Sequence, residues 1–385
     1  MKTNILMQKE NMYQLNTYRK YPLVISKGRG IFVYDIEGKK YLDFYGGHAV
    51  ASTGHCHPKI VKAIKNQLNK IIFYSNAVYN DSRSQALESL IKISPKGFSK
   101  VFFCNSGAEA NEAAMRMAKK FTNKNEIIAM KGSFHGRTTG ALSATGIEKY
   151  RTGDLLANFK FAEFGSIDSV KSLITNDTAA IILEPIQSMA GIRVAKNEFY
   201  RELQEICSEK NIILIFDEVQ TAFARTGKMF AAQKFESIPD IITLAKGIAS
   251  GLPMGAVLLK EDIAKTIKYG EQGSTFGGSP LVCAALKSTI DVIKEESLAK
   301  NAQIIGDYIK KKFENIDRIK EVRGEGLIIG LEFETDTAKI IEALLQNGII
   351  VSPAEPKNVI RLLPPLIVNK KHVDKFYDSM KTLKN

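Results

Sequence analysis

Apolar and polar residues alternate early in the chain, between residues 31 and 44. The segment reads IFVYDIEGKKYLDF, and its alternating positions flank Glu37-Gly38. A glycine adopts the positive φ of a tight turn without strain, so the pattern predicts two short strands joined at that turn. We therefore expect a β-hairpin ahead of the main body of the chain.

From about residue 58, helical patterns alternate with short, continuous apolar runs. Helical patterns such as FYRELQEICSEK separate three runs of strand length: AAIILEP (179–185), NIILIFDEV (211–219) and DIITLAK (240–246). Strands without polar alternation are buried on both faces, which is typical of a parallel sheet covered by helices. The sequence therefore predicts an α/β fold with a mostly parallel sheet flanked by helices.

After about residue 280, the order of the predicted elements changes. Two helical patterns, LVCAALKSTIDVIKEE and NAQIIGDYIKKKFE, come before short strands at LIIGLEFE and VIRLLPP. This block is typical of a smaller α+β domain. A chain of 385 residues is also longer than one core of ordinary size accommodates, so we expect at least two domains.

The chain is basic, with a formal net charge of +13, which invites a nucleic-acid or membrane-surface interpretation. The basic residues are dispersed, however. The longest like-charge run is Lys310-Lys311-Lys312, and the acids Glu314 and Asp317 follow it. Because a basic binding face needs clustered charge, we expect a solvated surface that binds neither nucleic acid nor a membrane.

The cysteines lie far apart in the sequence, at positions 56, 104, 207 and 283. A disulfide framework is unusual with such spacing, which favours a reducing compartment. The N-terminal apolar stretch is too short for a signal peptide, and no apolar run approaches the ~18 residues that cross a bilayer. We expect a soluble, cytoplasmic protein.

Ligands of open parallel sheets bind at the carboxyl ends of the strands, so the residues that follow each apolar run are candidates. The segment FFCNSGAEANEAAM passes from a strand through Ser106, Gly107 and Ala108 into a strong helical pattern. Small residues at a helix N-terminus expose backbone N–H groups that suit a phosphate. The same Ser-Gly pair is also an ordinary strand-to-helix turn.

Two charged residues follow apolar runs directly. Asp217 ends ILIFD, and Lys246 ends IITLAK. A buried carboxylate requires a partner, and a partly buried lysine has a lowered pKa, which makes its neutral amine a nucleophile toward a carbonyl. The alternative is a structural ion pair between Asp217 and Lys246.

A fourth candidate is the loop MKGSFHGRTTGALSATG, which carries Phe134, His135 and Arg137 between glycines. An aromatic ring on such a loop stacks on a flat ligand, and a guanidinium group binds a carboxylate. Together the four strand ends provide a phosphate site, an acid, an amine and an aromatic plate. That set is what pyridoxal 5′-phosphate requires.

Several motifs, in a fixed order, give the chain its resemblance to a known family: GRGIFVYDIEGKKYLDF, GHCHP, NSGAEANEAA, SFHGRT, LEPIQ, DEVQTAFARTG, LAKG, GSTFGG and IRLLPPL. From about Tyr18 to Pro365 the sequence resembles the class III pyridoxal-phosphate-dependent aminotransferases, in particular the acetylornithine and ornithine aminotransferase branch. The resemblance implies a fold-type-I homodimer. It also implies an N-terminal segment (1–45) that joins the small domain, a large cofactor-binding domain (46–280) and a C-terminal small domain (281–385).

The resemblance further implies a reaction, the transfer of the δ-amino group of N2-acetylornithine to 2-oxoglutarate. The products would be N-acetylglutamate 5-semialdehyde and glutamate, as in arginine biosynthesis. Another ω-amino donor, such as N2-succinylornithine, ornithine or a carrier-linked lysine, is the nearest alternative. A cofactor-binding scaffold without turnover is the alternative from another class, although the charged residues expected in the site are intact.

Residue by residue, the resemblance assigns the cofactor site. Lys246 would hold the cofactor as a Schiff base and shuttle a proton, and Asp217 would pair with the pyridinium nitrogen. Gln220 would bond the ring hydroxyl. The remaining assignments are Ser106, Gly107 and Ala108 for the phosphate, Phe134 for the ring, and Ser274 and Thr275, which would reach the phosphate from the other subunit.

For the substrates, the resemblance assigns Arg137 to the α-carboxylate of the amino donor and Arg361 to that of glutamate or 2-oxoglutarate. Three further residues would line the substrate pocket: Glu184, in the wall near Gln220, Tyr18 and His48. The segment LEPIQSMAG has Ser188-Met189 where most members of the family carry Gly-Glu, which leaves the acyl group of the donor open. The spacing of GHCHP matches no zinc site, so we expect no metal.

Overall fold

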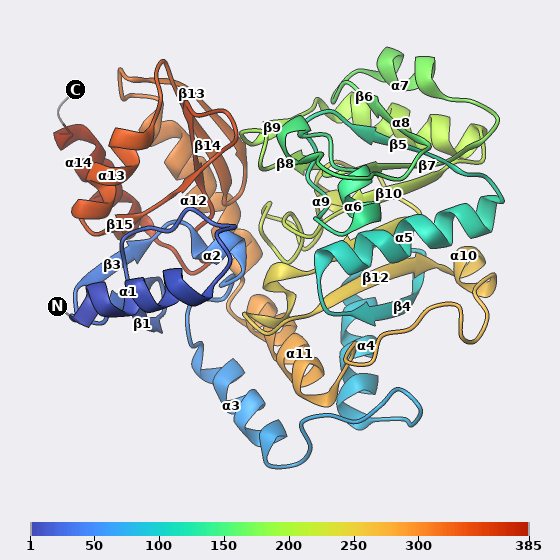
Figure 1. The fold of residues 1–385 in the computed structure, drawn as a ribbon, viewed down its shortest axis with the longest axis horizontal. Coiled ribbons are helices and arrows are strands. Elements are labelled where there is room, and N and C mark those ends of the chain that lie inside the picture. Colours follow the sequence, from blue (N-terminus) through green and yellow to red (C-terminus); the bar gives the residue numbers. More distant parts are fainter. Residues whose placement is uncertain (1, 384–385) are drawn as a thin grey trace.

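The computed structural model describes residues 2–383 and shows two parts side by side (Figure 1). The larger part is built on a seven-stranded sheet, and the smaller part on two four-stranded sheets. The first and the last described segments of the chain both lie in the smaller part (Figure 1). No helix within residues 2–383 is long and apolar enough to cross a membrane.

The large sheet has the strand order β4-β12-β11-β10-β7-β5-β6. Its strands are β4 (Phe98–Cys104), β5 (Glu126–Met130), β6 (Phe159–Ala162), β7 (Thr178–Leu183), β10 (Ile213–Asp217), β11 (Ile241–Leu244) and β12 (Gly255–Lys260). β12 runs antiparallel to its neighbours β11 and β4, and the other pairs are parallel. The prediction of a mostly parallel sheet is confirmed.

Successive residues of β10 point into opposite halves of the core. Ile215 belongs to an apolar cluster with residues of α5 (Gly107–Thr122), whereas Phe216 belongs to another cluster with residues of α8 (Asn197–Glu209). A strand that is buried on both faces has no polar side to alternate with its apolar side. This explains why β10 reads as a continuous apolar run.

α5 begins directly after β4 because the chain carries a helix cap there. The Ser106 side chain accepts the backbone N–H of Glu109 at 3.2 Å, and Asn123, with a φ of 53°, ends the helix in the left-handed region. The cap fixes the first turn of α5 at the carboxyl end of the sheet. Free backbone N–H groups therefore point toward the edge where ligands of such sheets bind.

The remaining helices of the larger part cover or connect its strands. They are α3 (Pro58–Leu68), α4 (Asp81–Ile93), α6 (Thr139–Ser143), α7 (Ile167–Leu173), α9 (Ala231–Lys234), α10 (Glu261–Lys265) and α11 (Pro280–Glu295). A short antiparallel pair, β8 (Ile186–Gln187) and β9 (Arg193–Val194), follows β7. α11 packs against α3 and α4.

The predicted N-terminal hairpin is confirmed. β2 (Phe32–Asp35) and β3 (Lys40–Asp43) are antiparallel, and Gly38 takes a φ of 87° in their turn. β1 (Ile25–Arg29) pairs with β2, and β3 pairs in parallel with β15 (Ile349–Ile350). The N-terminal segment and the C-terminal region therefore share one sheet.

The second small sheet has the order β13-β14-β17-β16. The rest of the smaller part comprises β13 (Ile319–Glu325), β14 (Ile328–Phe333), β16 (Ser352–Pro353), β17 (Val359–Leu362), α2 (Gly46–Ala49), α12 (Leu298–Phe313), α13 (Ala338–Gln346) and α14 (Lys370–Thr382). An N-terminal helix, α1 (Lys2–Tyr13), buries none of its side chains, so it leaves no apolar stripe in the sequence. The domain bounds 1–45, 46–280 and 281–385 stay predictions.

Candidate active site

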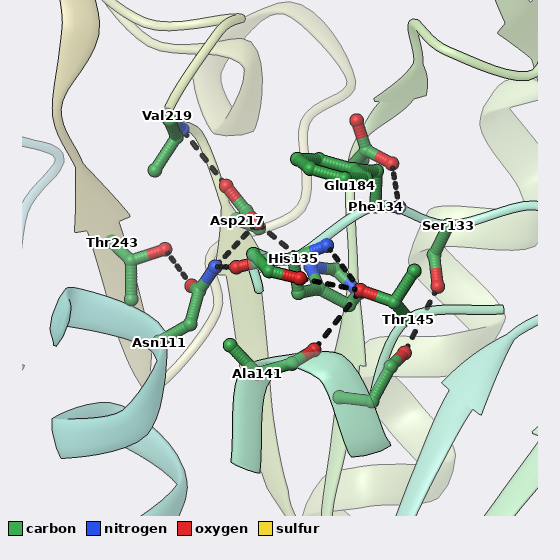
Figure 2. A network of polar contacts seen from close by, with 12 residues as sticks. Asn111, Ser133, Phe134, His135, Ala141, Thr145, Glu184, Asp217, Val219 and Thr243 are labelled. Atoms are coloured by element: carbon green, nitrogen blue, oxygen red, sulfur yellow. Dashed lines mark hydrogen bonds and ion pairs between the residues drawn. The ribbon is translucent and has the colours of Figure 1, made fainter. Parts of the chain in front are cut away.

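Asp217, the last residue of β10, lies in a network of donors. Its carboxylate is 4% exposed and accepts the Asn111 side-chain amide at 2.7 Å and the Val219 backbone N–H at 3.0 Å. Nδ1 of His135 lies 2.7 Å from the same carboxylate (Figure 2). Three partners therefore satisfy the oxygens of this buried group. No ion pair with Lys246 is found among residues 2–383, so the structural ion-pair alternative is wrong.

His135 links the loop after β5 to Asp217. Its side chain is fully buried, its backbone N–H donates to the Thr145 hydroxyl at 3.1 Å, and its carbonyl accepts from Asn111 at 2.7 Å (Figure 2). Because Nδ1 faces a carboxylate, a proton on Nδ1 donates to Asp217. The sequence places His135 in the candidate loop but gives it no role, and the structure shows that it orients Asp217.

Lys246 follows β11 in a 3₁₀ turn, Lys246–Ala249, and its backbone is left-handed with a φ of 49°. Desolvation lowers the pKa of Lys246, while Asp217 and Glu184 act in the opposite direction. A lowered pKa increases the fraction of neutral amine, which is the nucleophilic form. A Cβ on the next residue, Gly247, would lie 2.2 Å from the Ser52 hydroxyl, so only glycine fits beside this lysine.

Glu184 lies just after β7 and is buried. One of its oxygens accepts the backbone N–H of Phe134 at 2.8 Å (Figure 2). Burial raises the pKa of Glu184 to about 7. Glu184 therefore fixes the loop that carries the predicted stacking ring, and it does so without a full negative charge near neutral pH.

The predicted phosphate site lies at the first turn of α5. A Cβ on Gly107 would lie 2.9 Å from the Val219 side chain, and a Cβ on Gly136 would lie 2.6 Å from that of Ala108. The backbone of this turn is thus closely surrounded by the segments after β5 and β10. These close approaches bring Ser106, Gly107 and Ala108 to the same strand ends as Asp217.

An unpartnered oxygen of Gln220 supports a polar ligand at this site. Oε1 of Gln220 is buried without a partner, while Nε2 of Gln220 donates to the His48 carbonyl at 3.2 Å. A buried acceptor without a donor is costly, and a ligand hydroxyl would satisfy it. Together with the acid, the amine and the phosphate turn, this unpartnered oxygen fits pyridoxal phosphate.

Ser274 and Thr275 are the predicted cofactor residues that the resemblance assigns to the phosphate of the other subunit. The Ser274 hydroxyl accepts the Asn105 side-chain amide at 3.0 Å, next to the phosphate turn. Thr275 is exposed. Their contribution to the phosphate site of a second subunit stays a prediction.

Arg361, on β17, is 2% exposed and has only neutral partners. One terminal nitrogen lies 3.1 Å from both the Ser188 hydroxyl and the Met189 sulfur, and the other lies 2.9 Å from the Ser352 hydroxyl. Its Nε donates to the Pro353 carbonyl at 2.9 Å. Burial lowers the pKa of Arg361, as expected for a cation that no acid neutralises directly.

Arg137, like Arg361, has no acidic partner among residues 2–383. Its guanidinium carbon lies 4.4 Å from the ring centroid of Tyr150 and 5.7 Å from that of Phe134. Aromatic faces hold a guanidinium group without satisfying its N–H donors. Both arginines therefore keep donors for a carboxylate that the chain itself does not supply.

Of the predicted substrate residues, Tyr18 lies away from the site and His48 lies beside it. Tyr18 is 70% exposed, and the structure does not bring it to the other site residues. The ring of His48 lies 4.7 Å from that of Tyr45. Desolvation, and then the cations Arg361 and Lys246, lower the pKa of His48 to about 4, so this ring is neutral beside the site.

Tyr21 and Tyr45 are site residues that sequence reasoning missed. The Tyr21 hydroxyl donates to the Val351 carbonyl at 2.7 Å, and burial raises its pKa to about 12 although Arg361 opposes the shift. Arg361 acts in the same way on Tyr45. The signal for Tyr21 was present in the motif YRKY, where a second tyrosine follows Tyr18 by three residues.

Comparison with known proteins agrees with this geometry. The profile of the family described as Aminotransferase class-III matches residues 13–383. The acetylornithine aminotransferase of Methanocaldococcus jannaschii is 45% identical over 96% of this chain and 96% of its own length. That of Aquifex aeolicus is 42% identical over 94% of this chain and 97% of its own length.

Solved structures show the same similarity. The ornithine aminotransferase from Toxoplasma gondii ME49 has a TM-score of 0.93 and 30% identity, covering 98% of this chain and 95% of that chain. The acetylornithine aminotransferase from Elizabethkingia anophelis has a TM-score of 0.87 and 31% identity, covering 99% of both chains. The predicted fold-type-I architecture and the predicted pyridoxal-phosphate cofactor are thereby confirmed.

Proposed function

Because the chain belongs to the class-III aminotransferases, a pyridoxal-phosphate-dependent family, we propose that it transfers the δ-amino group of N2-acetylornithine to 2-oxoglutarate. The products are N-acetylglutamate 5-semialdehyde and glutamate. The names of the relatives support this donor. The structural observation that carries the proposal is the pair of arginines without acidic partners, Arg137 and Arg361, of which Arg361 lies close enough to Lys246 to lower its pKa.

Pyridoxal phosphate, when bound, supplies an electron sink for the carbon that loses its proton. Lys246 would hold it, the turn at Ser106, Gly107 and Ala108 would bind its phosphate, and Gln220 would accept its hydroxyl. The ring nitrogen of the cofactor would meet the Asp217 carboxylate. The donors from Asn111 and His135 fix the orientation of this carboxylate, which would pair with the protonated ring nitrogen.

Lys246 is the group placed to move a proton. With the cofactor bound, Nζ of Lys246 would take the proton from the amino-bearing carbon of the substrate and hold it as an ammonium group, which requires a neutral amine beforehand. The desolvation that lowers the pKa of Lys246 favours the neutral form.

The two arginines divide the substrates. One pocket must accept an acylated amino acid in one half of the reaction and a dicarboxylate in the other. Arg137 binds the α-carboxylate of acetylornithine, and Arg361 binds the α-carboxylate of glutamate or 2-oxoglutarate. A guanidinium group makes two parallel hydrogen bonds to a carboxylate, which fixes the orientation of each substrate.

A homodimer is part of the proposal. Apolar side chains are exposed along residues 71–79 and 269–276, namely Ile72, Phe73, Tyr74, Val78, Tyr79, Tyr269 and Phe276. The rings of Phe73 and Phe276 lie 5.2 Å apart, so the two segments form one patch. Such a patch is typical of a protein interface, and Ser274 and Thr275 lie within it. Mixing Lys246→Ala with Thr275→Ala subunits should restore activity if Thr275 serves the partner's site.

The cytoplasm is the proposed compartment. All the cysteines of the chain are free, and Cys104, Cys207 and Cys283 are buried as thiols. Proteins that keep free thiols fit a reducing environment. Fractionation of the native cells, with the protein detected by antibody, tests this.

The reaction is tested by spectra of the cofactor-loaded enzyme titrated with a panel of ω-amines. Acetylornithine should discharge the visible band of lysine-bound cofactor at the lowest concentration, and 2-oxoglutarate should restore it. A protein that shows no such band after incubation with pyridoxal phosphate is not an aminotransferase. A preference for free ornithine would refute the proposed donor.

One observation favours a second donor, N2-succinylornithine. Ser188 and Met189 contact Arg361 where an acid would neutralise it. A succinyl group ends in a carboxylate, which an unneutralised guanidinium attracts. The same panel decides between the donors, because this alternative requires the succinylated amine to discharge the band at a lower concentration than the acetylated one.

A further inference from the structure

Glu355 is an acid near both arginines that none of the roles above uses. It lies in the turn between β16 and β17, and its side chain is 14% exposed. One carboxylate oxygen accepts the hydroxyl of Tyr150, and the other pairs with Nζ of Lys149. Tyr150 and Glu355 are 205 positions apart in the chain, so this contact joins two separate walls of the pocket.

Tyr150 in turn contacts Arg137. Its ring centroid lies 4.4 Å from the guanidinium carbon, and its ring meets that of Phe134 edge-on at 5.7 Å. Arg137 itself is exposed and has no acidic partner within residues 2–383. The orientation of this long side chain therefore depends on the two aromatic rings.

We propose that Glu355 and Tyr150 form a brace that positions Arg137 for the carboxylate of the amino donor. Glu355 acts through the Tyr150 hydroxyl, which fixes the face of the ring against the guanidinium group. Both are positioning residues, and neither has to touch the substrate. The proposal rests on the proposed function, in which Arg137 serves the donor half of the reaction.

The protonation of Tyr150 agrees with this arrangement. Burial, and then its hydrogen bond to Glu355, raise the pKa of Tyr150, so the hydroxyl stays protonated and donates. The Lys149 side chain is 61% exposed, so its ion pair with Glu355 is screened by water. The buried contact to Tyr150 is the one expected to transmit an effect.

The same turn makes its hydrogen bonds to Arg361 and Met189 through its backbone, whereas the charge of Glu355 acts on Arg361 only at longer range, after Tyr45 and Glu184. The Pro353 carbonyl accepts Nε of Arg361 at 2.9 Å, and the Glu355 backbone N–H donates to the Met189 carbonyl at 2.9 Å. A substitution of the Glu355 side chain leaves both backbone contacts in place. The brace therefore predicts that the Arg137 half of the reaction is damaged more than the Arg361 half.

The test compares Glu355→Ala, Tyr150→Phe and the double variant, each loaded with pyridoxal phosphate. The half-saturating concentration of acetylornithine should rise about five- to tenfold in each single variant, while that of glutamate should change less than about twofold. The double variant should be no worse than Tyr150→Phe, because Glu355 has nothing to hold once the hydroxyl is gone. Glu355→Gln keeps an acceptor and should recover most of the loss.

Glu163→Ala is the matched control, because Glu163 forms an exposed ion pair with Lys131 and none with Arg137 or Arg361. It should change neither half. Additive effects in the double variant, an equal loss in both halves, or no loss for the donor would each overturn the brace. A wild-type enzyme that responds to glutamate but not to acetylornithine would instead refute the proposed donor, and the variants would then be compared with the ω-amine that does react.

Discussion

The part of the site around Asp217, which would hold the cofactor, differs from the part around Arg137 and Arg361, which would bind the substrates, in how its charges are partnered. We call these parts the cofactor end and the substrate end. Asp217 has three donors from its own chain, whereas Arg361 has only neutral partners and Arg137 lies against aromatic rings. Arg361 is buried without an acidic partner, which is costly unless a ligand supplies the missing charge. A carboxylate held by its own chain suits a resident group, and arginines without acidic partners suit carboxylate ligands that leave after each half of the reaction.

The strongest test of the cofactor end is Lys246→Ala. Multiple turnover should fall below about one thousandth of the wild-type rate, because the variant has no amine to hold the cofactor or to move the proton. Steady-state assays measure the loss, and absorbance spectra should lack the band of lysine-bound cofactor. Turnover close to that of the wild type would assign the chemistry to another residue.

Asp217→Asn keeps the shape of the side chain at the cofactor end and removes its charge. We expect turnover to fall about a hundredfold or more, while pyridoxal phosphate still binds through the turn at α5. Single-turnover rates and cofactor retention on dialysis separate the two effects. If the rate stays near that of the wild type, Asp217 has only a structural role.

Arg137→Ala and Arg361→Ala each remove one cation from the substrate end. Each should cost about 1.5–3 kcal/mol, the value of a hydrogen-bonded charge pair, in one half of the reaction. Arg137→Ala should weaken the ω-amine half, and Arg361→Ala should weaken the glutamate half. Equal damage to both halves by either variant contradicts the division.

Met189→Glu introduces an acid at the substrate end, beside a cation that has no acidic partner. The new carboxylate would lie beside Arg361, whose hydrogen bonds in the structure do not include Glu184. Binding of 2-oxoglutarate should weaken about tenfold, and any preference for a succinylated donor should fall. Met189→Leu conserves the volume and serves as control. An unchanged KM for 2-oxoglutarate in Met189→Glu would show that Met189 only fills space.

The smallest expected effect concerns Glu184, the buried acid between the cofactor end and the substrate end. The native protein keeps the Glu184 proton up to a pKa of about 7, whereas the ordinary pKa of a glutamate is 4.5. The contribution of Glu184 to stability is therefore complete below about pH 4.5 and is lost as the pH rises through about 7. Glu184→Gln should thus gain in unfolding midpoint relative to the wild type between pH 5.5 and 8, by thermal melts at each pH. A constant difference would contradict the raised pKa.

The sequence predicted the cofactor end better than the substrate end. The apolar runs of β10 and β11 fix where each strand stops, and Asp217 and Lys246 are the residues at those stops. The contact of His135 with Asp217 spans 82 positions and depends on how a loop packs, which no local pattern records. The direction of β12 was equally hidden, because an apolar strand reads the same whether it runs parallel or antiparallel.

The residues around the arginines are harder to predict for the same reason. Tyr150 ends a three-residue 3₁₀ turn, Glu148–Tyr150, and Glu355 lies in a turn, so neither belongs to a periodic pattern. Tyr18 matched the resemblance in a segment with little pattern to align, and the structure brings Tyr21 to the Arg361 region instead. Side chains that act through a neighbour become visible only once the chain is folded.

The pairing of β3 with β15 has a consequence for the synthesis of the chain. The hairpin of residues 32–43 cannot complete its sheet until residues 349–350 have been made. At the usual pace of translation, this delay is roughly 15–60 s. During that time Val33 and Tyr41, which the finished protein buries against Leu345 and Ile350, stay open to water and to other chains. The nascent hairpin therefore stays incomplete until the end of translation, and slow translation near the end of the message would prolong its exposure.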